Sequence, residues 1–231
     1  WEIIPEIVLE DVLEDSDNLN IEVGNFLQTQ KLHRFDAVLL GPGLGTGKED
    51  WSLISQPLQN FKGLLVIDAD GINRLASCSE SLIWLQKRQG PTWLTPHQKE
   101  FRRLFPDIPI TEPLDAAKTA AQVTGSSVLL KGANSIIADP SGKIWQLTQT
   151  APWVARTGLG DVLAGLASGL GSIGLAANEK ANGELLAKAA LIHAHAALGS
   201  KTGSSAGIIA NSIASHITSI QAKDVISGTW S

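Results

Sequence analysis

The chain of 231 residues contains one cysteine and no methionine. A single cysteine, Cys78, excludes an internal disulfide and any metal cluster held by several thiolates, so a reducing cytoplasm is the expected compartment. We interpret Cys78 itself as a small, half-buried side chain. Because methionine is missing even at position 1, where Trp1 stands, local motifs carry more weight here than residue counts over long distances.

Basic blocks and long apolar runs are also scarce. The chain has 18 Lys and Arg against 23 Asp and Glu, a formal charge of −5, so nucleic acid is not an expected partner. We expect no apolar run to be long enough to cross a membrane, and therefore no membrane partner. With 43% hydrophobic residues and no linker, repeat or low-complexity segment, residues 1–231 are expected to form one soluble domain.

The most informative stretch is RTGLGDVLAG, which runs from Arg156 to Gly165. Gly158 and Gly160 would allow a tight turn in which backbone N–H groups surround an anion at the start of a helix, where the helix dipole favours negative charge. Asp161 would lie beside that anion, where a carboxylate binds phosphate poorly but can accept a proton from a hydroxyl group. The stretch is a candidate active site. On its own it fits equally well a glycine turn with Asp161 as the cap of the helix.

Four apolar segments end in polar or glycine-rich loops, as the strands of a parallel sheet do. The segments are 36–40, 64–67, 92–94 and 128–130, and the loops after them are GPGLG (41–45), DADGIN (68–73), TPH (95–97) and KGAN (131–134). Stretches with helical periodicity lie between them, giving units of about 25 to 30 residues, the size of βαβ units. The strands do not alternate in polarity, which indicates that both sheet faces are covered. This predicts an α/β fold with a doubly wound, mainly parallel sheet and ligands at the carboxyl ends of the strands.

The pattern changes after residue 134. Residues 135–138 and 143–147 flank the turn DPSG and predict a β-hairpin. Helices are expected at 50–61, 79–89, 113–124, 162–172, 183–198 and 206–221. Residues 1–23 do not resemble a complete opening βα unit, so we expect the domain to lack its opening βα segment.

The 41–45 loop and the residues after it come close to two nucleotide-binding motifs but match neither. Pro42 stands where a P-loop requires its first glycine, and Glu49 stands where a Ser or Thr would bind Mg²⁺. Thr46 occupies the position of the third glycine of a dinucleotide fingerprint. The glycines still permit close approach of a ligand to the backbone. The alternative is a plain tight turn between a strand and a helix.

Single polar residues in these loops are further candidates. His97 follows a proline at a strand end, where nothing apolar requires it, so we predict a substrate contact. Lys131 directly follows a strand and suits a cation aimed at phosphate, although a solvated lysine is the alternative. Asp68, Asp70 and Asn73 could bind Mg²⁺ through water or cap the next helix, and the sequence does not separate these possibilities.

Two histidines lie together in LIHAHAAL, on an expected helix. His193 and His195 are two residues apart, so they point to different faces of a helix and cannot hold one metal ion together. We interpret both as packing or surface residues.

In their order along the chain, these motifs resemble the ribokinase-like family of ADP- or ATP-dependent NAD(P)H-hydrate dehydratases. The motifs are GPGLG (41–45), DADGIN (68–73), TPHQKE (95–100), KGANS (131–135) and GLGDVLAG (158–165). The resemblance implies a three-layer α/β/α sandwich and a nucleotide-repair lyase. ADP or ATP, with Mg²⁺, phosphorylates the hydroxyl of hydrated NADH or NADPH, and elimination of phosphate then restores the dihydronicotinamide.

The resemblance also implies a role for each motif. Asp161 is the catalytic base, beside an anion hole made by Gly158, Leu159 and Gly160. The substrate-binding residues are Gly43, Gly45, His97 and Asp161. The nucleotide-binding residues are Lys131, Gly132, Ala133, Asn134, Ser135 and Gly160. No metal ligand is assigned.

The chain departs from the family pattern at two places, one inside a motif and one before the last motif. Gln98 and Lys99 stand where a small residue and a glycine are usual, and QTAPWVAR, before the last motif, lacks the usual Gly-Asn-Pro-Gly. We expect a homo-oligomer and an epimerase domain or partner. The alternative functions are a ribokinase-like kinase of another small alcohol, of the vitamin-precursor type, and a non-catalytic nucleotide-binding module.

Overall fold

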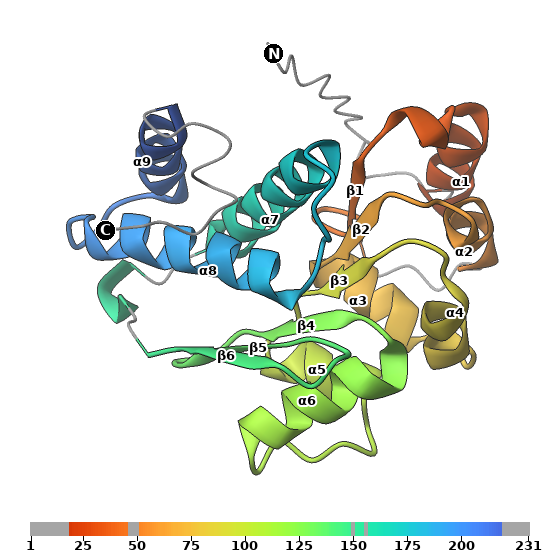
Figure 1. Cartoon of the computed structure of the whole chain (residues 1–231), viewed down its shortest axis with the longest axis horizontal. Coiled ribbons are helices and arrows are strands. Elements are labelled where there is room, and N and C mark those ends of the chain that lie inside the picture. Colours follow the sequence, from red (N-terminus) through yellow and green to blue (C-terminus); the bar gives the residue numbers. More distant parts are fainter. Residues whose placement is uncertain (1–18, 46–50, 149–150, 155–156, 219–231) are drawn as a thin grey trace.

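The computed structural model describes residues 19–45, 51–148, 151–154 and 157–218. Residues 1–18, with Thr46 and Glu49 of the rejected nucleotide motifs and Arg156 of the last motif, lie outside the described residues. In the described part, one mixed sheet lies between two layers of helices (Figure 1). This is the predicted three-layer α/β/α sandwich.

The sheet has six strands whose spatial order is their order in the chain. The strands are β1 (Ala37–Leu40), β2 (Leu64–Ile67), β3 (Thr92–Leu94), β4 (Ser127–Leu130), β5 (Ser135–Ala138) and β6 (Ile144–Leu147). Strands β1 to β4 are parallel, and β5 and β6 form the expected hairpin, antiparallel to β4 and to each other. The mainly parallel sheet is therefore confirmed.

The helices between the parallel strands cover one face of the sheet. Because each strand lies next to the one before it and crossovers are right-handed, every connecting helix falls on the same side. These helices are α2 (Ser52–Gln59), α3 (Ala69–Ala76), α4 (Ser81–Lys87), α5 (Gln98–Leu104) and α6 (Pro113–Thr124), with α1 (Leu19–Thr29) beside α2 and a short 3₁₀ turn, η1 (Leu32–Arg34), before β1. Leu65 and Ile67 of β2 point into this core.

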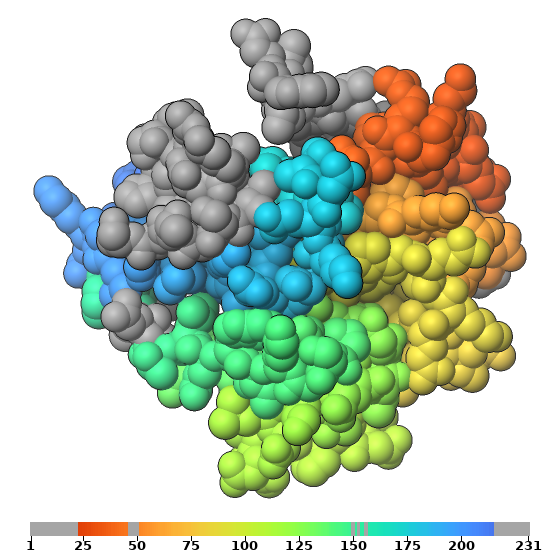
Figure 2. Space-filling view, in the orientation of Figure 1, coloured from red at the N-terminus to blue at the C-terminus, as the bar shows by residue number. Residues whose placement is uncertain are grey.

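The opposite face is covered by helices from the end of the described chain. They are α7 (Leu159–Ala176) and α8 (Gly183–Leu198), and α9 (Ala206–Thr218) packs on these two helices. A second 3₁₀ turn, η2 (Pro152–Val154), precedes α7. Leu64 and Val66 of β2 point toward them, so the apolar strand buries both of its faces as predicted. In the space-filling view, the early segments (red to yellow) lie on the right of the molecule, and the last helices (cyan and blue) lie to their left (Figure 2).

Helix α7 corrects one expectation about membranes. By length and composition alone, its 18 residues could cross a membrane, which the sequence reading missed because small residues and Asp161 interrupt its apolar character. A buried core helix passes the same test, and α7 packs on β1, β2 and α8. A Cβ on Gly171 would lie 2.1 Å from Cδ2 of Leu64, so α7 approaches the sheet too closely there for a side chain.

Candidate functional site

The predicted site residues meet at the carboxyl edge of the parallel strands. The backbone N–H of Gly45, after β1, donates to Oδ2 of Asp70 at 3.0 Å. Nζ of Lys131, after β4, lies 2.7 Å from Oδ1 of Asp68, after β2. A Cβ on Gly160, in the first turn of α7, would lie 3.6 Å from Nζ of Lys131. Loops far apart in the chain therefore form one polar rim.

The first turn of α7 has the geometry that the glycine motif predicts. Gly158 is the residue before the helix, and its φ of 90° is one that glycine adopts readily and other residues avoid. Asp161 lies in the first turn with an exposed side chain. The alternative in which Asp161 caps the helix is wrong, because Gly158 occupies the cap position. The free N–H groups of this turn can bind an anion, and the Asp161 carboxylate stands beside them.

The ammonium group of Lys131 lies close to this helix start and forms an ion pair with Asp68. The Asp68 side chain is 1% exposed and that of Lys131 is 20% exposed, so Lys131 is not the solvated lysine of the alternative interpretation. An ammonium group has three hydrogens to donate, and the contact with Asp68 uses one of them. The others are available to an anion at the start of α7. Asp68 precedes α3, but its side chain makes no capping hydrogen bond.

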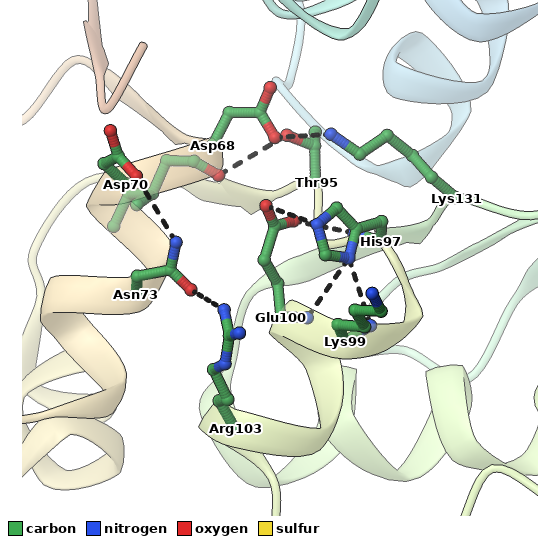
Figure 3. A network of polar contacts seen from close by, with 10 residues as sticks. Asp68, Asp70, Asn73, Thr95, His97, Lys99, Glu100, Arg103 and Lys131 are labelled. Atoms are coloured by element: carbon green, nitrogen blue, oxygen red, sulfur yellow. Dashed lines mark hydrogen bonds and ion pairs between the residues drawn. The ribbon is translucent and has the colours of Figure 1, made fainter. Parts of the chain in front are cut away.

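His97 is the residue that begins helix α5, and its ring caps that helix (Figure 3). Its Nδ1 accepts hydrogen bonds from the backbone N–H groups of Lys99 at 3.0 Å and Glu100 at 3.2 Å. Its Nε2 lies 3.0 Å from Oε1 of Glu100. The backbone N–H of His97 donates to Oε2 of Glu100 at 2.8 Å. Because Nδ1 accepts, the ring hydrogen belongs on Nε2 and points to Glu100. The ring is 48% exposed, so its face remains open to a ligand.

Glu100 is a buried carboxyl group that the sequence reading did not assign a role. Burial raises its pKa, while the hydrogen bond from the His97 backbone and the charge of Lys131 act in the opposite direction. Its side chain is 6% exposed. The spacing of His97 and Glu100, three residues apart at a helix start, is that of a capping box and is the signal that could have identified the pair.

His97 lies beside Lys131 and not across the site from it. The two residues form a parallel backbone bridge that extends the pairing of β3 with β4. Gly43 follows β1, which lies two strands away from β3. Because neighbouring parallel strands end side by side at this edge, the His97 loop lies next to Lys131, and the 41–45 turn lies farther along the edge.

The 41–45 turn contains three glycines in the left-handed region. The φ angles of Gly41, Gly43 and Gly45 are 136°, 72° and 69°. A Cβ on Gly41 would lie 1.8 Å from the carbonyl oxygen of Asp68, whereas a Cβ on Gly43 would meet nothing within 4 Å. Leu44 is buried in the core below. The turn is thus anchored on one side and open at Gly43 on the other.

Arg74 of α3 is a residue that sequence reasoning missed. Its Nη2 donates to the carbonyl of Leu44 at 2.6 Å, and its Nε donates to the carbonyl of Gly45 at 2.9 Å. Asp70, one helical turn earlier, accepts from the N–H of Gly45. Two charged residues four apart share one face of a helix, and this spacing in the 68–74 segment is the signal that could have identified them.

Of the remaining residues, the nucleotide loop is exposed, His193 lies against the start of α7, and, within the described part of the chain, His195 and Cys78 form no hydrogen bond or ion pair with the site residues named above. Residues 132–134 of the predicted nucleotide loop are exposed, and Ser135 Oγ lies 3.5 Å from both the N and the O of Gly132. His195 is exposed, while His193 faces inward, so the two do lie on different faces of α8. The ring of His193 hydrogen-bonds the backbone of Leu159, and burial lowers its pKa. Cys78 is partly buried against the core, as predicted.

Metal binding by protein side chains alone is not supported. Among the residues that the structure describes, no three His, Cys, Asp or Glu side chains form a group that could hold a metal ion. Asp68 contacts Lys131 and makes no capping hydrogen bond, and Asp70 accepts from Gly45, while the alternative of Mg²⁺ binding through water stays a prediction. Proteins usually bind Mg²⁺ through one or two carboxylates together with waters and nucleotide phosphates.

Comparisons with known proteins agree with this geometry. A family model described as NAD(P)H-hydrate dehydratase matches residues 3–219. Relatives named bifunctional NAD(P)H-hydrate repair enzyme Nnr include one from Synechocystis sp., 39% identical over 92% of this chain and 39% of its own length, and one from Gloeobacter violaceus, 46% identical over 60% of this chain and 26% of its own. The chain thus spans at most about two fifths of the length of these curated relatives.

Solved structures with the same fold include one from Bacillus subtilis and one from Enterococcus faecalis. An ADP/ATP-dependent NAD(P)H-hydrate dehydratase from Bacillus subtilis, co-crystallised with ATP and Mg²⁺ and soaked with CoA, has a TM-score of 0.67 at 20% identity and covers 86% of this chain and 72% of its own. A ribokinase-like protein from Enterococcus faecalis has a TM-score of 0.65 at 25% identity and covers 86% of this chain and 66% of its own. At these identities the likeness is one of fold.

Proposed function

The chain belongs to the NAD(P)H-hydrate dehydratase family, and from this premise we propose that it repairs hydrated NADH and NADPH with ADP or ATP as co-substrate. The observation that carries the proposal is the start of α7. There an exposed Asp161 stands beside the free N–H groups of a glycine turn, with the Lys131 ammonium close to Gly160. Pure binding of phosphate would gain nothing from a carboxylate at that place.

Asp161 acts as the base in the proposed reaction. It takes the proton from the hydroxyl of the hydrated nicotinamide while that oxygen attacks the terminal phosphorus of the nucleotide. The N–H groups of Gly158, Leu159 and Gly160 and the ammonium of Lys131 stabilise the charge on the transferred group. ADP or AMP leaves as the phosphoryl group is transferred. The carbon–oxygen bond of the phosphorylated hydrate then breaks, inorganic phosphate leaves, the neighbouring ring carbon loses a proton to solvent, and the electrons of that C–H bond form the ring double bond.

The two ligands occupy neighbouring parts of the carboxyl edge. Gly43, Gly45 and His97 contact the hydrated dinucleotide, on the side of β1 to β3. The nucleotide lies over the exposed loop of residues 131–135 and over Gly160. Support comes from the open space at Gly43, the half-exposed ring of His97 and the exposure of residues 132–134.

Magnesium accompanies the nucleotide in this proposal. When bound, the ion neutralises charge on the phosphates and so favours transfer. The protein contributes Lys131 and the helix start, and no described residue is assigned as a ligand of the ion.

The proposal also covers the organisation of the protein. Residues 1–231 form a single cytoplasmic catalytic domain that acts as a homo-oligomer. An epimerase domain or partner accompanies it, in keeping with relatives named bifunctional that are more than twice as long as their matched part.

A direct assay tests the proposal. The protein is incubated with hydrated NADH, Mg²⁺ and either ADP or ATP, and the return of dihydronicotinamide absorbance is recorded. Recovery that depends on both protein and nucleotide is expected. A stable phosphorylated product would instead indicate a kinase of another small alcohol, and binding without turnover would indicate a nucleotide-binding module.

A further inference from the structure

The 41–45 turn needs an external constraint to keep one shape. Its three left-handed glycines are the residues with the greatest backbone freedom, so the turn alone would sample many conformations. When a ligand must order such a flexible backbone on binding, the entropy cost of ordering lowers the affinity for the ligand. Whatever orders the turn therefore influences how tightly it binds a ligand.

Helix α3 supplies this constraint from the buried side of the turn. Arg74 is 5% exposed and donates to two successive carbonyls, those of Leu44 and Gly45, at 2.6 and 2.9 Å. Asp70 accepts the N–H of Gly45 at 3.0 Å. The rigid fork of a guanidinium suits two adjacent acceptors in a way that a lysine cannot match.

A chain of polar contacts ties this constraint to the neighbouring loop (Figure 3). Nδ2 of Asn73 donates to Oδ1 of Asp70 at 3.4 Å, and Nη1 of Arg103 donates to Oδ1 of Asn73 at 2.7 Å. Arg103 lies on α5, the helix that His97 begins and caps. The 41–45 turn and the His97 loop are therefore held by one connected set of side chains.

We propose that Arg74 and Asp70 are positioning residues that hold the 41–45 turn in its binding conformation and so set the affinity for the hydrated dinucleotide. The choice of ligand rests on the function proposed above. The two side chains contact the backbone of Leu44 and Gly45, whereas a Cβ on Gly43 would meet nothing within 4 Å, so a ligand can approach Gly43 without touching either side chain.

The chain offers a matched control at the other end of the sheet. Arg88 is also buried, 9% exposed, and also donates to backbone carbonyls, those of Leu58, Gly63 and Pro91. Gly63 and Pro91 precede β2 and β3, so Arg88 lies at the amino edge of the strands. Loss of Arg88 removes comparable buried contacts without touching the site.

The test compares Arg74→Ala, Arg74→Lys, Asp70→Ala and Arg88→Ala in steady-state kinetics. We expect Arg74→Ala and Asp70→Ala to raise KM for hydrated NADH by roughly tenfold, the scale of a lost charged hydrogen bond. KM for the nucleotide should stay near the wild-type value. Arg74→Lys should recover part of the loss, and Arg88→Ala should change neither KM. Equal changes in both KM values, or none in the Arg74 and Asp70 variants, would overturn the proposal.

Amide hydrogen exchange makes the test independent of activity. Exchange in the 41–45 segment should speed up in Arg74→Ala and Asp70→Ala and stay unchanged in Arg88→Ala. If the exchange changes while the wild-type protein repairs no hydrate, the proposed function fails and the constraint on the turn stands. If exchange in this segment is unchanged in both variants, the constraint itself is refuted. Asp70→Ala keeps the test valid if Arg74→Ala does not fold.

Discussion

At each edge of the parallel sheet, a buried arginine donates hydrogen bonds to backbone carbonyls, but only one of the two edges carries the candidate site. At the carboxyl edge, Arg74 holds the backbone carbonyls of the 41–45 turn. At the amino edge, Arg88 holds carbonyls before β2 and β3, donates to Oγ1 of Thr92 at 3.0 Å, and lies over the rings of Phe61 and Trp84. Burial lowers the pKa of Arg88 to about 10, so it stays charged at neutral pH.

The glycines show where the edges differ. At the amino edge a Cβ on Gly63 would lie 2.3 Å from Cζ of Phe61, and one on Gly90 would lie 2.4 Å from the carbonyl oxygen of Gly63. At the carboxyl edge Gly41 is also confined, with a Cβ 1.8 Å from the carbonyl oxygen of Asp68, but Gly43 faces open space and Gly160 has room for a Cβ at 3.6 Å from Nζ of Lys131. Buried arginines and glycine turns therefore do not identify a site by themselves. The open backbone beside a helix start does.

Asp161→Asn gives the largest expected effect at the carboxyl edge. Loss of the base should lower kcat by about two orders of magnitude or more, while the fold and nucleotide affinity persist. Kinetics together with thermal unfolding measure this.

As the contrast, Arg88→Ala should leave kcat unchanged and lower the free energy of unfolding by about 2 to 4 kcal/mol, because buried carbonyls lose a charged donor. Near-normal turnover of Asp161→Asn would remove Asp161 from the mechanism.

Lys131→Ala should affect one ligand more than the other. Its ammonium faces the start of α7, so its loss should weaken ADP or ATP by about tenfold and the hydrated dinucleotide less. The variant also leaves the buried Asp68 without its partner, which destabilises the fold. Calorimetric titration well below the unfolding temperature compares the two affinities. Equal losses for both ligands would contradict the assignment of Lys131 to the nucleotide.

His97 allows the capping role and the ligand contact to be separated. His97→Ala should raise KM for hydrated NADH several-fold and also destabilise α5 by about 1 kcal/mol, the usual cost of a lost helix cap. His97→Asn keeps a good capping residue, so it should restore stability but not KM. If His97→Asn restores both properties, the ring has no role beyond the cap.

The smallest expected effect is a change in pH dependence from His193. Burial holds its pKa in the folded protein below the ordinary value of 6.5, so below that pH the unfolded chain binds more protons. The protein should therefore lose stability as pH falls from 6.5 toward the lowered pKa, by at most about 1.4 kcal/mol per pH unit. Chemical denaturation of His193→Asn should show a weaker loss, and the exposed His195→Asn should match wild type. Parallel curves for all three proteins would show that His193 does not titrate in this way.

Much of the fold could be predicted from the sequence, because apolar strands and helical periodicity are local signals. Strands β2, β3 and β5 and helices α6 and α8 have the predicted bounds. Helix α7 extends beyond the expected 162–172 at both ends, since glycine and serine weaken the periodic pattern. The short helices α3 and α5 begin inside the loop motifs, where polar residues mask them.

The site was predictable as a set of loops but not as a set of contacts. Parallel strands bring their carboxyl ends to one edge whatever the side chains are, so the grouping of the 41–45 turn with Asp68, His97 and Lys131 followed from topology. The start of α7 follows the antiparallel hairpin, so its place at this edge did not. The pairing of Lys131 with Asp68, and the reach of Arg74 to the carbonyl of Leu44, depend on distances between segments 30 or more residues apart. No local pattern encodes these distances.

The most direct test of the proposed repair reaction measures two products in one reaction. Wild-type protein is given hydrated NADH, Mg²⁺ and limiting ATP, and inorganic phosphate and dihydronicotinamide are both quantified over time. We expect the two products to appear together and in equal amounts, because the phosphate placed on the hydrate leaves as the ring is restored. Consumption of ATP with phosphate retained on an organic product, and no recovery of dihydronicotinamide, would contradict it.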